Sequence, residues 1–281
     1  MTKQPFKTDL PVLLPAHAQK PEEAFQIKFW HGVALFGVCL MSTGYVFAYD
    51  SQTQASAFAT LVKWIPLLLS GFLFNVIISF CAMALGTIVG TILGLGQISL
   101  MPAIKGSSWL VTQFFRNAPW LVLLFFAMFL LPFEFDLGFV VIPFPDWVKA
   151  IIGLSLPVMA NVSEVVRGAI ASLPSGQWEA AESLAYSRRQ TLWLVILPQC
   201  VKRMLPPWMN LYSILTMATV LASVVGVSEV MTLTGEALAA EGGRTDLLAP
   251  FYSFVLLIFF IYCYPIARYT VYLEKKFAVK N

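Results

Sequence analysis

The sequence has few charged residues: only 12% of its 281 residues are Asp, Glu, Lys or Arg, whereas 58% are hydrophobic. A water-soluble domain of this length carries about a quarter charged residues. The charges stand in short clusters between long uncharged runs, which is typical of a polytopic membrane protein. The net charge of +3 is small, and no basic patch with interleaved aromatic residues supports binding to nucleic acid.

Histidines and paired cysteines are also scarce. The two histidines, His17 and His31, are too few for most metal sites and most acid–base enzyme sites. No C-x-x-C spacing occurs, and the cysteines lie in or beside apolar runs, so we interpret them as small buried apolar side chains: Cys39, Cys81, Cys200 and Cys263. The sequence also lacks H-E-x-x-H and G-x-S-x-G motifs, which argues against an intramembrane enzyme. We therefore expect neither metal ligands nor catalytic residues.

The long apolar runs predict an all-α protein with six membrane spans. The first, Phe29–Tyr49, has 21 uncharged residues, enough for one helix across a bilayer. A cleaved signal peptide is the alternative there, because Ala55-Ser56-Ala57 follows. The polar leader of 28 residues and the overlong apolar run favour a retained anchor. The other predicted spans lie within Trp64–Ile104 and at about Ser108–Leu131, Trp147–Leu173, Met204–Val225 and Leu247–Tyr269.

The second apolar run needs subdivision. Trp64–Ile104 is uncharged for 41 residues, too long for one straight span at about 1.5 Å per residue. We expect a linker over residues 50–65, then an interfacial segment, and a membrane part bracketed by Ser70-Gly71 and Gly94-Leu95-Gly96. Gly86, Gly90 and Gly94 recur every four residues on one helix face, and small residues at this spacing allow close helix packing. This helix is therefore expected inside the bundle.

Lysine and arginine are distributed unevenly between the two sides of a six-span chain. One side, with both termini, would hold 15 of the 18 basic residues, and the other would hold Lys63, Lys149 and Arg244. Basic residues concentrate in cytoplasmic loops. We therefore predict that the tails 1–28 and 274–281 are cytoplasmic and that the loop Glu134–Asp146 is external.

A polar segment separates the fourth and fifth predicted spans. Residues 175–198, which we call the elbow, read SGQWEAAESLAYSRRQTLWLVILP. Ser175 is a candidate N-cap for a first short helix. Ser187 with Gln190 forms an S-x-x-Q capping box for a second helix, which is expected to stop near Pro198. An ordinary amphipathic loop at the membrane surface is the alternative interpretation.

The elbow resembles the EAA loop of the permease subunits of bacterial ABC importers. That pattern is E-A-A, three residues, Gly, nine residues and I-x-L-P; Val195 stands for Ile and Ala185 replaces the Gly, while the matching residues are Glu179, Ala180, Ala181, Leu197 and Pro198. Four segments are similar, in the same order, to permeases of polar amino-acid uptake systems: FFRNAPWLVLLFF (Phe114–Phe126), SEVVRGAIASLPSGQWEAAESL (Ser163–Leu184), LPPWMN (Leu205–Asn210) and VVGVSEV (Val224–Val230).

The resemblance implies a five-helix core of the type I ABC-importer permease over residues 66–273. Residues 29–49 would add one extra N-terminal transmembrane helix, and residues 50–65 would be a periplasmic linker. Such a chain would be a multi-pass subunit of the bacterial inner membrane that moves a polar amino acid or a derivative by alternating access. Its partners would be a second permease subunit, identical or homologous, two ATPase subunits and a periplasmic substrate-binding protein. This chain would hold no cofactor, because the partner ATPase would bind ATP and Mg.

By this resemblance, the elbow would be a coupling helix that docks on the ATPase. The candidate contacts are Trp178, Glu179, Ala180, Ala181, Leu184 and Ala185. An alanine with left-handed backbone angles costs about 1 kcal/mol. We therefore expect Ala185 to keep right-handed angles, with the turn one or two residues later, near Tyr186.

Candidates for the substrate route are ionisable groups at membrane depth and polar residues of the fifth span. They are Arg116, Asn117, Glu164, Arg167, Tyr212, Ser213, Thr216 and Thr219. Glu164 and Arg167 are three apart on a helix, so we place their mutual pairing ahead of substrate contact. Similar permeases often have Lys-Asp before a Thr in the fifth span, where this chain has Met217-Ala218.

A secondary transporter or channel subunit is the alternative function. Intramembrane acids that form a relay, or an internal repeat, would favour it. The sequence shows neither feature.

Overall fold

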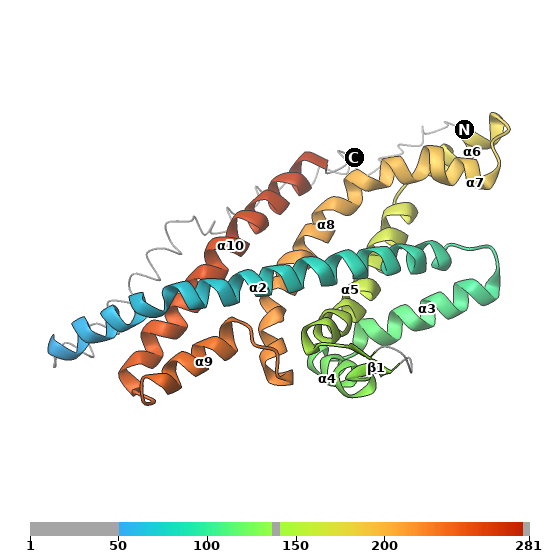
Figure 1. Cartoon of the computed structure of the whole chain (residues 1–281). Coiled ribbons are helices and arrows are strands. Elements are labelled where there is room, and N and C mark those ends of the chain that lie inside the picture. The colour runs from blue at the N-terminus through green and yellow to red at the C-terminus, as the bar shows by residue number, and fades with distance from the viewer. Residues whose placement is uncertain (1–50, 137–140, 278–281) are drawn as a thin grey trace, which may run out of the picture. The chain divides into compact units, whose positions relative to one another are not determined.

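The structure, a computed structural model, describes residues 51–136 and 141–277. The predicted span 29–49 and the tail 1–28 lie outside these residues. The described chain is mainly helical (Figure 1), as predicted, and two short strands pair antiparallel between α4 and α5. Its elements are α2 (Ser51–Gln97), α3 (Pro102–Asn117), α4 (Trp120–Leu130), β1 (Glu134–Asp136), β2 (Val141–Pro143), α5 (Asp146–Ala171), α6 (Gly176–Ser183), α7 (Arg188–Gln190), the π-helix η1 (Thr191–Ile196), α8 (Leu197–Ala218), the 3-10 helix η2 (Thr219–Val225), α9 (Val230–Ala240), the 3-10 helix η3 (Thr245–Leu247) and α10 (Leu248–Phe277).

Four described helical segments are long and apolar enough to cross a membrane: Ala57–Gln97, Asp146–Ala171, Arg188–Val225 and Thr245–Phe277. They coincide closely with the predicted fourth span and contain the predicted second, fifth and sixth spans. The helix α5 is the most buried of the four: 67% of its most apolar stretch is buried within the chain, against 28–39% in the other three. We therefore regard α5 as the central helix. The chain is therefore multi-pass, and the count of six spans stays a prediction because residues 1–50 lie outside the described chain.

The predicted third span, at about Ser108–Leu131, is broken into two helices. α3 and α4 are long and apolar enough to cross a membrane only when taken together, and they are bent by 107° at the break between them. The break lies at Ala118-Pro119, where both residues are extended, with ψ of 138° and 131°. The proline ring disfavours helical angles in the residue before it, so the helix ends at Asn117.

The expected linker over residues 50–65 is helical in the described part. α2 runs without a break for 47 residues from Ser51, with Pro66 inside it, and ends at Gln97. At about 1.5 Å per residue it is about 70 Å long, more than twice the hydrocarbon core of a bilayer. Tertiary packing explains why the predicted linker is helical, because a hydrophobic cluster joins this part of α2 to α9, η3 and α10. The cluster consists of Ala57, Leu61, Leu68, Ala237, Leu238, Leu247 and Phe251.

Polar contacts fasten the same part of α2 to the end of α9. Lys63 Nζ and Trp64 Nε1 each donate a hydrogen bond of 2.9 Å to Glu241 Oε1. The bonds from Lys63 and from Trp64 hold the pKa of the Glu241 carboxyl below its usual value. The sequence could not pair these residues, because about 177 positions separate them along the chain.

The glycine face of α2 packs against α5, as predicted. A methyl group on Gly86 would lie 2.5 Å from Val158 Cγ1, and one on Gly90 would lie 2.5 Å from the Met159 carbonyl oxygen. At Gly94 it would lie 2.7 Å from Val166 Cβ. Real contacts are never this short, so the three glycines set how closely the two backbones approach.

We expect Gly90→Ala to destabilise the protein by about 1–3 kcal/mol, because the added methyl group would overlap a backbone carbonyl that cannot move freely. Gly235→Ala is the matched control: Gly235 is also helical, in α9, and a methyl group there has no neighbour within 4 Å. The midpoint of thermal unfolding in detergent should fall for Gly90→Ala and not for Gly235→Ala. Equal midpoints for the two variants would contradict the tight contact between α2 and α5.

Candidate functional site

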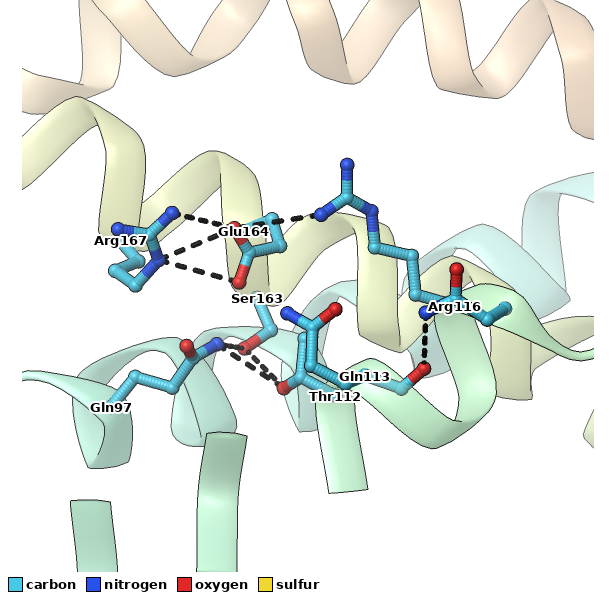
Figure 2. A network of polar contacts seen from close by, with 8 residues as sticks. Gln97, Thr112, Gln113, Arg116, Ser163, Glu164 and Arg167 are labelled. Carbon is cyan, nitrogen blue, oxygen red and sulfur yellow. Dashed lines mark hydrogen bonds and ion pairs between the residues drawn. The ribbon is translucent and has the colours of Figure 1, made fainter. Parts of the chain in front are cut away.

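A carboxylate between two guanidinium groups is the centre of the first candidate site (Figure 2). Glu164 on α5 forms an ion pair with Arg167 one turn later, with 2.7 Å between Nη2 and Oε2. Arg116, from the last turn of α3, lies on the other side, with its Nη1 3.8 Å from the same oxygen. The predicted pairing of Glu164 with Arg167 is confirmed. Arg116 was a predicted candidate, but its contact with Glu164 was not predicted, because only the tertiary fold brings α3 to α5.

A buried network of uncharged polar groups lies beside this cluster and joins three helices (Figure 2). Gln97 at the end of α2 donates to Ser163 Oγ at 2.8 Å and to Thr112 Oγ1 on α3 at 3.2 Å. The two hydroxyl groups are 3.0 Å apart. Sequence analysis missed these residues, because single uncharged polar side chains in apolar runs give no signal of their own.

Two cavities meet at Glu164. The first, of about 510 Å³, opens between α3, α5 and α8, and its polar lining comes from Arg116, Asn161, Glu164, Ser172, Arg203 and Asn210. The second, of about 520 Å³, lies against α2, α3 and α5, and its lining includes Gln97, Lys105, Trp109, Gln113, Glu164 and Arg167. Both volumes are in the range of small-molecule sites, about 300–1,000 Å³. Glu164 therefore lines two spaces of ligand size: the first also has the guanidinium groups of Arg116 and Arg203, and the second has that of Arg167.

The other predicted route residues do not line either cavity. Asn117 donates to the Gln113 carbonyl at 2.7 Å and lies at the end of α3. In the fifth span, Ser213, Thr216 and Thr219 are buried and each donates to a carbonyl of its own helix. The hydroxyl of Tyr212 lies 2.8 Å from that of Tyr262 on α10. A route through these four residues stays a prediction.

The elbow is the second candidate site. Its first helix, α6, ends in a Schellman motif: Tyr186 N–H donates to the Ala181 carbonyl at 3.1 Å, and Ala185 N–H donates to the Glu182 carbonyl at 2.8 Å. This pair of bonds needs a left-handed residue at Ala185. Ala185 has φ of 58°, so the expectation that it keeps right-handed angles is wrong. The two bonds offset the cost of a left-handed alanine.

Two other local expectations for the elbow differ from the structure, and one is confirmed. Ser175 precedes α6 with helical angles and makes no side-chain cap, because backbone turns start the helix there. The capping box of Ser187 and Gln190 is present. The second helix does not stop near Pro198, which lies in the first turn of α8, where a missing N–H does no harm. The π-helical stretch η1 precedes it, so helical structure continues from the elbow into the fifth span.

The exposed face of the elbow contains only some of the predicted contact residues. Glu179 and Ala180 are exposed, and Leu184 is 70% exposed, which is unusual for a leucine. Ala181 is buried within the chain at 3% exposure, so its side chain packs inside the elbow. Trp178 is half-buried against the core, and the Arg188 guanidinium lies 5.5 Å from its ring.

Hydrogen bonds fix the elbow to the helices on either side. Arg203 Nη1 on α8 donates to the carbonyl and the hydroxyl of Ser172, at 2.7 and 2.8 Å, where α5 ends. Gln199 Nε2 donates to Gln177 Oε1 at 3.1 Å, which ties α8 to α6. The elbow therefore forms one unit with the ends of α5 and α8, and a force on it would reach both helices.

We expect Ala185→Gly to stabilise the elbow by about 1 kcal/mol, because glycine adopts left-handed angles without the steric cost that alanine has. The measurement is the rate of limited proteolysis within the elbow in detergent, which should fall. Ala180→Gly is the matched control: Ala180 lies inside α6 with helical angles, so glycine there should destabilise the helix and raise the rate. Faster cleavage of Ala185→Gly would contradict the motif.

The chain resembles known transport proteins in sequence and structure. Residues 86–279 match the family described as binding-protein-dependent transport system inner membrane component. The inner membrane amino-acid ABC transporter permease protein YhdY of Escherichia coli is 35% identical over 188 residues, which are 67% of this chain and 50% of that relative. The probable amino-acid ABC transporter permease protein YckA of Bacillus subtilis is 33% identical over 217 residues, 77% of this chain and 92% of the relative. This chain therefore spans half the length of the first relative and most of the second.

A solved structure described as an amino acid ABC transporter with histidines is similar in fold. It has a TM-score of 0.65 and 24% sequence identity, over 78% of this chain and 98% of that chain. At this identity the likeness shows the fold alone.

Proposed function

Because the chain belongs to the family of binding-protein-dependent transport system inner membrane components, we propose that it forms part of the pathway of an ATP-driven importer. It is a multi-pass inner-membrane permease. The finer assignment is an importer that carries a polar amino acid or a derivative by alternating access. The names of the similar proteins support this substrate class, since both are described as amino-acid ABC transporter permeases.

The main observation behind the proposed mechanism is that helical structure continues without a break from the elbow into α8. In our proposal, the exposed face formed by Glu179, Ala180 and Leu184 docks on a cytoplasmic ATPase, and ATP with Mg binds only to that partner. Closure of the ATPase dimer would then move the elbow, and with it the ends of α5 and α8, as a rigid lever. Both termini of the six-span chain would lie on the cytoplasmic side, which the excess of basic residues there favours.

We assign the cavity lined by Arg116 and Glu164 to the substrate route. The Arg116 side chain is 46% exposed, and its guanidinium group is only loosely paired with Glu164, at 3.8 Å, so we propose that it is available to an anionic group. A substrate carboxylate would compete with Glu164 for Arg116, and a substrate ammonium group would be attracted by Glu164. Zwitterionic amino acids carry both groups.

The test is reconstitution of the permease with its ATPase and binding protein in proteoliposomes. Purification of the tagged chain in detergent should retain an ATPase subunit, and radiolabelled amino acids should enter the vesicles only with ATP and the binding protein. A non-hydrolysable ATP analogue should stop uptake. Ion or solute flux through the purified chain alone, without ATP, would instead support the channel or secondary transporter.

A further inference from the structure

A fully buried polar cluster joins α2, the end of the fifth span and the start of α9. Its members, Asn75, Thr219 and Glu229, each have 0% exposure. Asn75 Nδ2 donates to Glu229 Oε2 at 2.7 Å and to Thr219 Oγ1 at 3.0 Å, while Asn75 Oδ1 accepts from Val230 N–H at 3.1 Å. A buried carboxylate in an apolar bundle is costly unless it is fully paired. These bonds therefore fix the three elements firmly in one arrangement.

Glu229 also makes the first turn of α9. Its Oε1 accepts from the backbone N–H groups of Met231 and Thr232, at 2.8 and 3.1 Å, as an N-cap does. α9 then lies along α2: a methyl group on Gly71, one turn before Asn75, would be 2.9 Å from Val230 Cα. The other end of α9 is bonded to α2 through Glu241. α9 is therefore held to α2 at its start and at its end.

The cluster lies at one end of a long helical lever. Helical structure runs from Arg188 to Val225, with the elbow at its beginning and η2, which contains Thr219, at its end. Gly226 follows with φ of 88°, a left-handed turn that ends the lever. Figure 1 shows α7 and the end of α8 that meets η2 at opposite ends of this segment. If the elbow is displaced, α8 tilts only when its other end is held in place. If that end is free, the whole helix shifts instead.

We propose that Asn75 and Glu229 are positioning residues that form this fixed point, about which α8 pivots when the elbow moves. The inference rests on the proposed function, since it needs an elbow that an ATPase moves. It goes beyond that function because it assigns a role to a cluster that lies outside the elbow and lines neither cavity at Glu164. Neither residue contacts substrate in this proposal.

The donor and acceptor pattern allows a sharp test. In Glu229→Gln, the new amide would place its N–H donors against the Asn75 N–H donors, and the cluster would lose its central bond. Adding Asn75→Asp reverses the pattern: the aspartate accepts from the new amide at position 229 and from Val230 N–H, and the Thr219 hydroxyl turns to donate to it. The double variant therefore restores complementary bonds and keeps one carboxyl group in the cluster, so it should rescue the single variants.

The measurement is the number of substrate molecules imported per ATP hydrolysed by the full complex in proteoliposomes. Glu229→Gln and Asn75→Asp should each lower this ratio roughly tenfold, with basal ATP hydrolysis and the amount of assembled complex unchanged. The double variant should return it to near the wild-type value. A purely structural role would instead lower assembly and basal hydrolysis together and leave the ratio unchanged, and that result would overturn the proposal.

A milder matched pair keeps the test decisive if a single variant fails to assemble. Thr219→Val removes a hydroxyl of the cluster, whereas Thr234→Val removes an equally buried hydroxyl that donates to the Val230 carbonyl of its own helix. Only Thr219→Val should lower the coupling ratio, and it should do so with the apparent affinity for substrate unchanged; equal ratios, or a change in that affinity that accounts for the loss, would overturn the pivot. A wild-type complex that imports nothing in response to ATP would overturn the proposed function itself, which is a separate result.

Discussion

Glu179→Arg and Ala180→Trp should each abolish ATP-driven uptake while the permease stays in the membrane. Both side chains are exposed on α6, so neither change disturbs packing within the chain. The arginine would place a positive charge against a rim of the ATPase that we propose to be basic or rich in N–H donors, and the tryptophan would hold the two surfaces apart. Loss of one desolvated charge contact at an interface costs about 2–5 kcal/mol, enough to release or uncouple the ATPase.

The measurements are substrate-stimulated ATP hydrolysis, uptake and the amount of permease in the membrane. Ala181→Trp is not a useful variant here, because Ala181 is buried and the tryptophan would disrupt the elbow itself. Glu236→Arg is the matched control, since Glu236 is an exposed glutamate on α9, far along the chain from the elbow. Full transport by a Glu179→Arg, Ala180→Trp double variant would mean that the elbow is only an interfacial loop.

Glu164→Gln should lower uptake roughly tenfold or more, because it removes the only carboxylate that the structure places beside two guanidinium groups in the described chain. The exposed fractions of the two arginines, 46% and 43%, allow water to screen part of the unpaired charge, so the permease should still fold. The change should act on the apparent affinity for substrate if Glu164 contacts the substrate ammonium group.

Two double variants separate substrate contact from structural pairing. If Glu164 serves only to neutralise Arg167, then Glu164→Gln with Arg167→Gln should restore uptake, because both charges are gone. If Glu164 and Arg116 hold the two ends of a zwitterion, no such rescue should occur, and Glu164→Gln with Arg116→Gln should be worse than either single change. Wild-type uptake by Glu164→Gln alone would remove this cavity from the substrate route.

The sequence by itself determined the features that depend on composition and on short spacing. Scarce charge and long apolar runs are sufficient to identify a multi-pass helical protein, because only helices satisfy the backbone within a single apolar segment. The glycines at every fourth position indicated a close helix contact, and the three-residue spacing of Glu164 and Arg167 predicted their ion pair. The capping box at Ser187 is equally local. Each of these features is set by residues that lie close together along the chain.

The folded structure, rather than the residue types, decided which local preferences prevail. Alanine disfavours left-handed angles, yet Ala185 adopts them because two backbone hydrogen bonds close α6 there. Residues 51–65 look like a linker, but they are helical, and Ala57 and Leu61 pack in a hydrophobic cluster with residues of α9 and α10. Pro198 suggests a helix end, and the π-helical stretch before it lets the chain continue into α8.

Long-range polar contacts were beyond the sequence for a physical reason. Asn75 meets Glu229 across 154 positions, and Gln97 meets Ser163 across 66. No spacing rule relates residues that far apart; their contact depends on how closely whole helices pack. The class of transport protein and the position of the elbow could therefore be predicted from the sequence. The carboxylate between two arginines and the buried cluster of Asn75, Thr219 and Glu229 exist only because α2, α3, α5 and α9 come together.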